Sequence, residues 1–193
     1  PDKGAIDEVH LAIKTIHKRS NGLLHFVNTY RNLTKIPKSN FKIALVKEVI
    51  DDIKLIVSEE IKANNIECNI SIEPESLEFY ADTKLIEQVL INLIKNAIHA
   101  LENRSNSKIQ LRAFLNKRGR ATIQVTDNGH GILPDVLDKI FIPFFTTKQK
   151  GSGIGLSLSK QIMRLHGGSI TATSEVEDPE NNIKGNTVFT LTF

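Results

Sequence analysis

Three glycines stand within five residues of one another in the stretch KGSGIGLSLSKQIMRLHGGS, residues 150–169. Such a cluster marks a tight turn or a place where the backbone approaches a ligand closely. The residues that follow have the spacing of an amphipathic helix, and a helix N-terminus offers free N–H groups and partial positive charge to an anion. The stretch predicts either a phosphate-binding loop or a flexible turn, followed by a helix that ends at Gly167–Gly168.

A polar stripe lies within the otherwise apolar segment 83–101. Five side chains share this stripe at spacings of three and four residues: Gln88, Asn92, Lys95, Asn96 and His99. Asparagine oxygens are hard ligands that suit Mg²⁺, which usually keeps several waters and binds substrate phosphates. The stripe therefore predicts a cation and phosphate site, or else an ordinary solvated helix face.

Asp127 ends an alternating segment and is followed by Gly129 and Gly131 in TDNGHGI. A carboxylate accepts hydrogen bonds from an exocyclic amine, and glycine backbone can lie close to a flat ligand. Asp127 is therefore a candidate for recognising adenine, although Asp-Asn-Gly is also a common turn.

Three phenylalanines punctuate the glycine-rich stretch IFIPFFTTKQKGSGIGL, residues 140–156, namely Phe141, Phe144 and Phe145. Such residues either seat a movable loop and cover a ligand, with Lys148 and Lys150 facing phosphates, or anchor a surface loop. A P-loop is absent from the sequence, and so is a dinucleotide fingerprint, whose third glycine would stand at Leu156.

Positioning these segments requires a scaffold of helices and strands. Periodicity predicts helices over 43–63, 83–101 and 154–165, a shorter one in PDVLDKI, and strands at IECNISIE, 77–80, KIQLRAFL, RATIQVTD, 169–174 and TVFTLTF. Asp82 is a candidate N-cap for the second helix, and NKRG is a hairpin turn. This order predicts an α+β fold, a two-layer sandwich with one helical layer on one sheet.

Before this region, apolar residues recur three and four apart from Ile6 to Thr34, interrupted by Ser20. This is a heptad seam of four repeats that ends at KIPKSN, where Pro37 disfavours further helix. Because one helix cannot bury such a seam alone, we expect a partner helix from another segment or another subunit.

Composition narrows the class of protein only slightly. The chain has 193 residues, 40% hydrophobic and 24% charged, with a formal net charge of +3. Because the charges of both signs alternate, a nucleic-acid role gains little support. The single cysteine, Cys68, excludes an internal disulfide, and no apolar run reaches the roughly 20 residues of a membrane span. Pro1 in place of an initiator Met indicates a piece of a longer protein.

Four motifs, NLIKNA, DNGHGI, IFIPFFTTK and GSGIGLSLSKQI, resemble in order and spacing the N, G1, F and G2 boxes of bacterial sensor histidine kinases. The resemblance implies a Bergerat-type ATP-binding catalytic domain over 41–193, of the superfamily that includes gyrase, the ninety-kilodalton heat-shock chaperone and mismatch-repair ATPases. Residues 1–38 resemble the second helix of the dimerisation and histidine-phosphotransfer domain. Within these residues, the sequence RSNGLLHFVNTYRNLTKIP is most similar to that of nitrogen-regulation-type sensors.

The resemblance also implies roles for individual residues. Asn96 would bind Mg²⁺ with Asn92 as its companion, and Asp127 would take the adenine amine in a pocket shaped by Gly129 and Gly131. The catalytic basic residues near the phosphates would be His99 and Lys148. Segment 132–151 would form an ATP lid. Further ATP contacts would come from Phe145, Thr146, Thr147, Gly151, Ser152, Gly153, Ile154, Gly155, Leu156 and Thr187.

Two departures from the family pattern bear on activity. Relatives that hydrolyse ATP rapidly carry a glutamate general base where this chain has Asn92, which cannot take a proton, so fast hydrolysis is disfavoured. The other departure concerns three histidines of the first helix, none of them in the expected His-Glu context: His10, His17 and His25. We therefore expect the phosphoacceptor histidine on an upstream helix outside this sequence.

The resemblance thus implies a fragment that binds Mg-ATP and transfers the γ-phosphoryl to a histidine for relay to the receiver domain of a response regulator. It further implies a homodimer through the N-terminal helix, and a cytoplasmic domain of a parent protein anchored in the bacterial inner membrane. The alternatives are an ATPase of the same fold that drives a conformational cycle, a nucleotide-sensing module without phosphotransfer, and an unrelated helix-bundle scaffold.

Overall fold

The computed structural model describes residues 10, 12–14, 16, 17, 20, 39–148, 151–178, 180, 181 and 183–193. The chain divides into two units, Pro1–Ser39 and Asn40–Phe193. In the first unit the described residues from 10 to 20 are helical, as predicted, and Ile13 and Ile16 of the heptad seam are 60% and 65% exposed. His10 and His17 lie on this helix, whereas His25, Pro37 and the seam beyond Ser20 lie outside the described residues.

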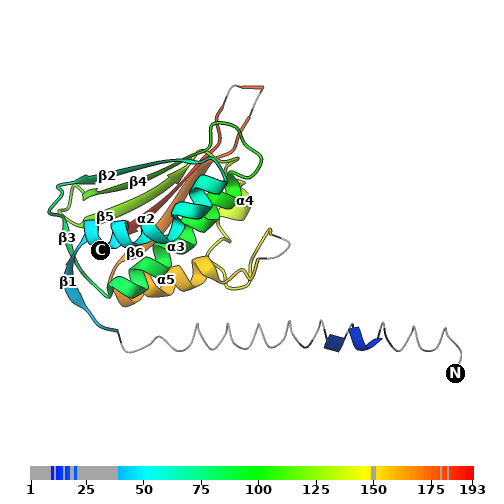
Figure 1. The fold of residues 1–193 in the computed structure, drawn as a ribbon, viewed down its shortest axis with the longest axis horizontal. Helices are drawn as coiled ribbons and strands as arrows, with labels where there is room; N and C mark the ends of the chain where they lie inside the picture. Colours follow the sequence, from blue (N-terminus) through cyan, green and yellow to red (C-terminus); the bar gives the residue numbers. More distant parts are fainter. Residues whose placement is uncertain are drawn as a thin grey trace, which may run out of the picture. The chain divides into compact units, whose positions relative to one another are not determined.

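The second unit is a two-layer sandwich, which confirms the predicted α+β fold (Figure 1). A five-stranded sheet has the order β2-β4-β5-β7-β6, in which β2 and β4 are parallel and the other neighbours antiparallel. Its strands are β2 (Glu67–Glu73), β4 (Lys108–Leu115), β5 (Ala121–Asp127), β6 (Ser169–Glu175) and β7 (Asn186–Thr192). A separate antiparallel pair consists of β1 (Lys42–Leu45) and β3 (Glu78–Ala81).

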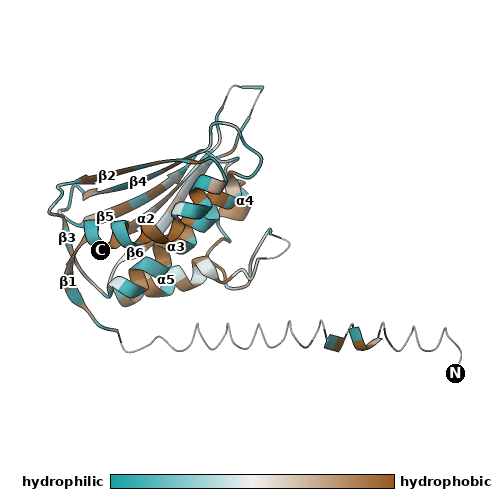
Figure 2. Cartoon of the chain, in the orientation of Figure 1, coloured by the Kyte–Doolittle hydropathy of each residue, from teal (hydrophilic) through white to brown (hydrophobic). Residues whose placement is uncertain are grey.

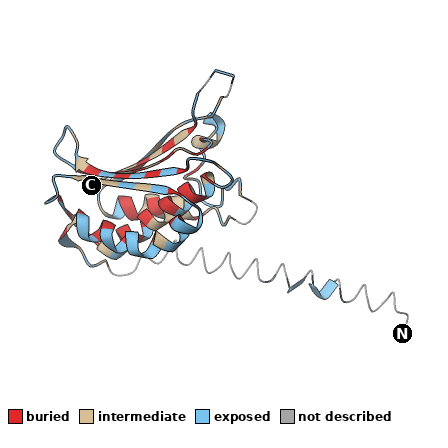
Figure 3. Ribbon diagram, turned by 45° about the horizontal axis from the view of Figure 1, so that its top comes forward, coloured by how far each residue is buried: buried red, intermediate tan, exposed pale blue. Residues whose placement is uncertain are grey.

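Three long helices cover one face of the sheet, and the core lies between the two layers (Figures 1 and 3). They are α2 (Val46–Ala63), α3 (Thr83–Ala100) and α5 (Gly155–Leu165), and a single-turn helix, α4 (Pro134–Leu137), follows β5. Hydrophobic residues dominate α3 along its length (Figure 2). Because α3 packs against the sheet and both neighbouring helices, little of its surface is left for polar side chains.

Asp82 begins α3 as predicted. One carboxylate oxygen accepts hydrogen bonds from the amides of Lys84 and Leu85 at 3.1 and 3.3 Å, which satisfies N–H groups that the first turn leaves unpaired. The other oxygen accepts from the amide of Asn40 at 2.8 Å. Asp82 therefore fixes the start of α3 to the point where the chain enters the second unit.

The predicted helix over 43–63 is wrong at its beginning. Residues Lys42–Leu45 form β1, and α2 begins only at Val46. Ile43 pairs with Tyr80 of β3, and the ring of Phe41 stacks on Tyr80 with 5.5 Å between centroids. An apolar run such as IALV suits either element, so pairing with a strand more than 30 residues away decided the outcome.

Strand register places Asp127, at the end of β5, next to residues of two other strands. Asp127 lies between Ile109 of β4 and Thr187 of β7 in adjacent strands.

At the opposite end of the helical layer, Gly167 with φ of +66° ends α5, as its glycine pair predicts. Within the described ranges, none of the helices combines the length and hydropathy needed to cross a bilayer.

Candidate functional site

A cavity of about 1010 Å³ opens between α3, the loop after β5, residues 145–148 and 151–156, and β7. It is lined by every residue assigned to the ATP site from the sequence except Gly129 and Lys150, the latter outside the described residues. Three more lining residues belong to the predicted lid, Ile132, Val136 and Ile140, and four were not predicted: Ala100, Glu102, His130 and Phe189. Its volume is at the upper end of the range for small-molecule sites. Residues from distant parts of the sequence therefore converge on one space.

The polar stripe of α3 is divided by the cavity. Asn92, Asn96 and His99 line it, whereas Gln88 and Lys95 are exposed and do not. Nδ1 of His99 lies 2.9 Å from Oε1 of Glu102, a contact that is an ion pair only when the imidazole is protonated. The stripe is thus divided: three side chains line the cavity, and two form a solvated helix face.

A lysine ammonium lies against the amide oxygen of Asn96. Nζ of Lys148 donates a hydrogen bond to Oδ1 at 2.8 Å. Burial lowers the pKa of Lys148, and Glu102 opposes this shift. The contact shows that Asn96 directs a hard oxygen atom toward a position where a cation is accommodated.

Asn92 makes the close contact between α3 and α5. Its amide Nδ2 donates to Oγ of Ser159 at 3.1 Å, and that hydroxyl donates to the carbonyl of Gly155 at 2.9 Å. A Cβ atom built on Gly155 would lie 2.1 Å from Oδ1 of Asn92. Glycine at 155 therefore leaves room for the Asn92 amide in this position, and a larger residue would displace it.

The N-terminus of α5 faces the cavity through Ile154, Gly155 and Leu156. Among the side chains that the structure describes, none caps this end of the helix. The first-turn amides and the positive end of the helix dipole are therefore available to an anion. This geometry matches the phosphate-binding alternative for the glycine cluster.

Asp127 lies at the other end of the site and is only 3% exposed. Its Oδ1 accepts a hydrogen bond from the amide of Gly129 at 2.9 Å. Burial raises the pKa of Asp127 to about 6, against the lowering effects of that amide, His130 and Arg104. The carboxylate is therefore an acceptor whose ionisation is sensitive to its surroundings near neutral pH.

A second acceptor stands beside Asp127 on β7. Oγ of Ser174 donates to the carbonyl of Asn186 at 2.6 Å and lies 2.9 Å from Oγ1 of Thr187. Because the Ser174 proton is already used, Thr187 is the donor in the second contact, which leaves its lone pairs as acceptors. Two acceptors side by side suit a ligand edge that carries an amine.

The loop that carries the two predicted glycines is tightly packed. A Cβ atom on Gly129 would lie 2.7 Å from Oδ1 of Asp127 and 2.8 Å from Cβ of Ala100. Gly131 has φ of +80°, and its Cβ would lie 2.0 Å from the carbonyl oxygen of Glu175. Gly129 does not line the cavity, so its place is behind Asp127 rather than on the ligand side.

The three phenylalanines have different environments. Phe141 packs against the core, Phe145 lines the cavity, and Phe144 has φ of +67° and is 40% exposed. The amide of Phe144 donates to the carbonyl of Gly153 at 2.8 Å, which closes the base of the loop between them. The predicted lid, 132–151, is thus anchored over its first half, and Lys150 lies outside the described residues.

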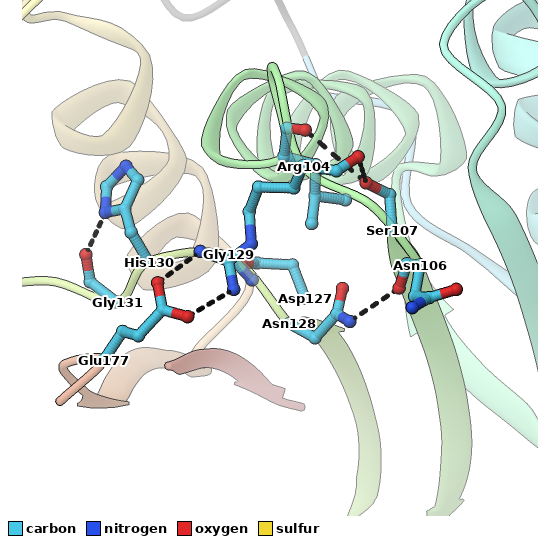
Figure 4. Close-up of polar contacts among 10 residues, drawn as sticks. Arg104, Asn106, Ser107, Asp127, Asn128, Gly129, His130, Gly131 and Glu177 are labelled. Atoms are coloured by element: carbon cyan, nitrogen blue, oxygen red, sulfur yellow. Dashed lines mark hydrogen bonds and ion pairs between the residues drawn. The ribbon is translucent and has the colours of Figure 1, made fainter. Parts of the chain in front are cut away.

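Sequence reasoning missed an ion pair beside the loop of Asp127. Arg104, after α3, makes a bidentate contact with Glu177, after β6, with N–O distances of 2.6 and 3.0 Å (Figure 4). The two residues are 73 positions apart in the sequence. No local pattern marks either of them, so only the fold reveals the pair.

The family model described as histidine kinase-, DNA gyrase B- and HSP90-like ATPase matches residues 81–193. Sensor histidine kinase ZraS of Salmonella typhimurium is 32% identical over 167 residues, covering 86% of this chain and 36% of ZraS. Sporulation kinase D of Bacillus subtilis is 33% identical over 175 residues, covering 90% and 34%. The chain spans about a third of the length of these relatives.

Solved structures show the same architecture. The catalytic domain of histidine kinase ThkA superposes with a TM-score of 0.64 at 32% identity, covering 79% of this chain and 97% of that domain. ThkA in complex with the response regulator protein TrrA superposes with a TM-score of 0.66 at 27% identity, covering 93% and 50%.

The packing of Gly131 leads to a stability prediction with a matched control. We expect Gly131→Ala to lower the free energy of unfolding by at least about 2 kcal/mol more than Gly119→Ala, because overpacking adds to backbone strain. Gly119 also has a positive φ, +70°, but nothing lies within 4 Å of its added Cβ. Urea unfolding followed by circular dichroism gives both values. Equal losses would show that the contact with Glu175 relaxes at no cost.

Proposed function

The chain belongs to the family of histidine kinase-, DNA gyrase B- and HSP90-like ATPases, and from this premise we propose that it binds Mg-ATP in the α3–α5 cavity. We further propose that the intact protein transfers the γ-phosphoryl group to a histidine. The family membership agrees with the resemblance carried by the four sequence motifs.

The observation that carries the proposal is the opposite chemistry of the two ends of one cavity. At one end, the uncapped N-terminus of α5 and the ammonium of Lys148 attract phosphates. At the other end, Asp127 and Thr187 present acceptors to the exocyclic amine of adenine. Guanine carries an acceptor in place of that amine, so the same pair of acceptors disfavours it.

The residues present fit a magnesium ion that arrives with the nucleotide. Asn96 offers a hard oxygen that already faces a cation. The described residues contain no group of three histidine, cysteine or acidic side chains suited to holding a metal by themselves. Phosphates and water would therefore supply most of the ligands, as is usual for Mg²⁺. When bound, the ion would neutralise phosphate charge.

The environment of Asn92 favours phosphotransfer over rapid hydrolysis. Its amide nitrogen is held by Ser159, and an amide cannot take a proton from water. Glu102 also lines the cavity, but its carboxylate is paired with His99. In our proposal His99 and Lys148 are the basic residues next to the phosphates, and the protein contributes positioning and charge neutralisation.

The partners follow from the same proposal. The acceptor would be a histidine on a helix upstream of residue 1, and the phosphoryl group would pass to the receiver domain of a response regulator. ThkA, which has the same architecture, has been solved with such a regulator. Dimerisation through residues 1–38 and membrane anchoring of the parent protein belong to this proposal too.

Asp127 provides the direct test of nucleotide binding. We expect Asp127→Asn to weaken Mg-ATP binding by about 10- to 100-fold, because a hydrogen bond to a charged group is lost. The affinity for Mg-GTP should change much less. Isothermal titration calorimetry measures both ligands on both proteins. Unchanged ATP affinity in the variant would remove Asp127 from the nucleobase site.

Asn96 and Gln88 provide a matched pair on one helix. Asn96→Ala should reduce by about tenfold the gain in ATP affinity that Mg²⁺ brings, equivalent to losing roughly 1.4 kcal/mol. Gln88→Ala, on the same sequence stripe but outside the cavity, should leave that gain unchanged. Titrations with Mg²⁺ and with EDTA give the two affinities. An equal effect of both substitutions would place the metal elsewhere.

Phosphotransfer is tested on a chain that includes the upstream segment. With ATP labelled at the γ-phosphate, we expect an acid-labile, alkali-stable protein label that is lost in Asp127→Asn. Fast release of phosphate without protein label would instead favour the ATPase alternative. ATP binding with neither label nor release would favour the nucleotide-sensing module.

A further inference from the structure

The Arg104–Glu177 ion pair joins two segments that enclose the nucleobase end of the cavity. Arg104 lies in the loop after α3, where its amide donates to the carbonyl of Leu101 at 3.2 Å. Glu177 follows β6, and its amide donates to the carbonyl of His130 at 3.1 Å. The loop from Asp127 to Gly131 therefore runs beside the ion pair, as Figure 4 shows.

This loop has little freedom to move away from the pair. Gly131 abuts the carbonyl of Glu175, and Gly129 abuts Ala100 at the end of α3. Both supporting segments are held together by two N–O contacts of 2.6 and 3.0 Å. The side chains of Arg104 and Glu177 are 25% and 39% exposed, so the pair is partly shielded from solvent. The guanidinium is thus fixed close to the loop of a buried carboxylate.

The charged groups around Asp127 come from several elements. Arg104 and Glu177 lie behind the loop, His130 lies on it, and the cavity side holds the His99–Glu102 pair. The strand neighbours on β4 and β7 are uncharged, Ile109 and Thr187. The groups that oppose the effect of burial on the pKa of Asp127 are the amide of Gly129, His130 and Arg104.

We propose that Arg104 is a positioning residue for the nucleobase site, which keeps Asp127 in its carboxylate form. Glu177 holds the guanidinium in place and at the same time neutralises part of the charge that Asp127 experiences. The inference rests on the proposed function because the carboxylate matters as the acceptor of the adenine amine. It adds an electrostatic role for two residues outside the cavity.

This role predicts opposite effects for the two partners of one ion pair. Removing the guanidinium charge in Arg104→Met raises the pKa of Asp127, so its proton is lost at higher pH. Removing the carboxylate charge in Glu177→Gln leaves the guanidinium less neutralised, so the pKa of Asp127 falls. A purely mechanical brace would give the same sign in both variants, because both loosen the same loop.

The test is a pH titration of the Asp127 carboxyl group by carbon-13 NMR in the nucleotide-free protein. The signal is assigned by its loss in Asp127→Asn. We expect the midpoint to rise by about half a pH unit in Arg104→Met and to fall by a similar amount in Glu177→Gln, the scale of partly exposed charge pairs. The control is Lys47→Met, which removes a cation from the exposed Lys47–Glu75 pair of other elements and should leave the midpoint unchanged.

An unchanged midpoint in either variant, or a rise in Glu177→Gln, overturns the proposal. If Arg104→Met does not fold, Arg104→Lys provides a variant that keeps the positive charge but loses the bidentate guanidinium. In that case the direction of the midpoint shift in Glu177→Gln alone still decides between an electrostatic and a mechanical role.

Nucleotide binding separates this inference from the proposed function. The pH below which Mg-ATP affinity falls should shift in the same directions as the Asp127 midpoint. Phosphate groups also titrate near pH 6, but their contribution cancels between variant and wild type. A wild-type protein that does not bind Mg-ATP at any pH contradicts the proposed function, whereas binding with an unshifted profile contradicts only the role of Arg104.

Discussion

The close approach of α5 to α3 at Gly155 is the constraint on which the rest of the site depends. With 2.1 Å between a Cβ on Gly155 and Oδ1 of Asn92, a side chain there would displace the Asn92 amide. Ser159 then ties the two helices together through Asn92 and the carbonyl of Gly155. This contact sets the distance between the free amides of α5 and the oxygen of Asn96. The groups to which we assign phosphate and cation binding are thereby held in one arrangement.

The same two helices are joined again at their other ends. His166, at the end of α5, accepts a hydrogen bond from the amide of Asp82 at 3.0 Å through Nε2. Its Nδ1 lies 2.7 Å from the carbonyl of Ile162, so the ring is neutral with its proton on Nδ1. Phe41 packs on this ring with 4.8 Å between centroids. Both ends of the helix pair are therefore fixed, and one end lies where the chain enters the domain.

Local signals explain what could be predicted from the sequence. Asp82 caps α3 because its carboxylate accepts hydrogen bonds from first-turn amides, and Gly167 ends α5 because it adopts a positive φ. The strands were predicted from the alternation of apolar and polar residues within each segment. The strand at Lys42–Leu45 was missed because its partner, β3, is remote in sequence. Arg104 and Glu177 could not be recognised in the sequence, because an ion pair between residues of distant loops produces no periodic pattern. The position of Gly129 behind Asp127 likewise follows from contact with Ala100, which only the fold creates.

Burial of charged side chains makes the two ends of the cavity favour different ligand groups. Asp127 and Lys148 are both partly removed from water, which raises the pKa of Asp127 and lowers that of Lys148. Burial makes each charge less stable than it would be in solvent, and a ligand that offers a complementary group would stabilise it. A nucleotide placed with its phosphates toward α5 satisfies both ends. The reverse orientation would set phosphates against the Asp127 carboxylate and leave the α5 amides without an anion, so in our proposal the polarity of the site selects one orientation of the nucleotide.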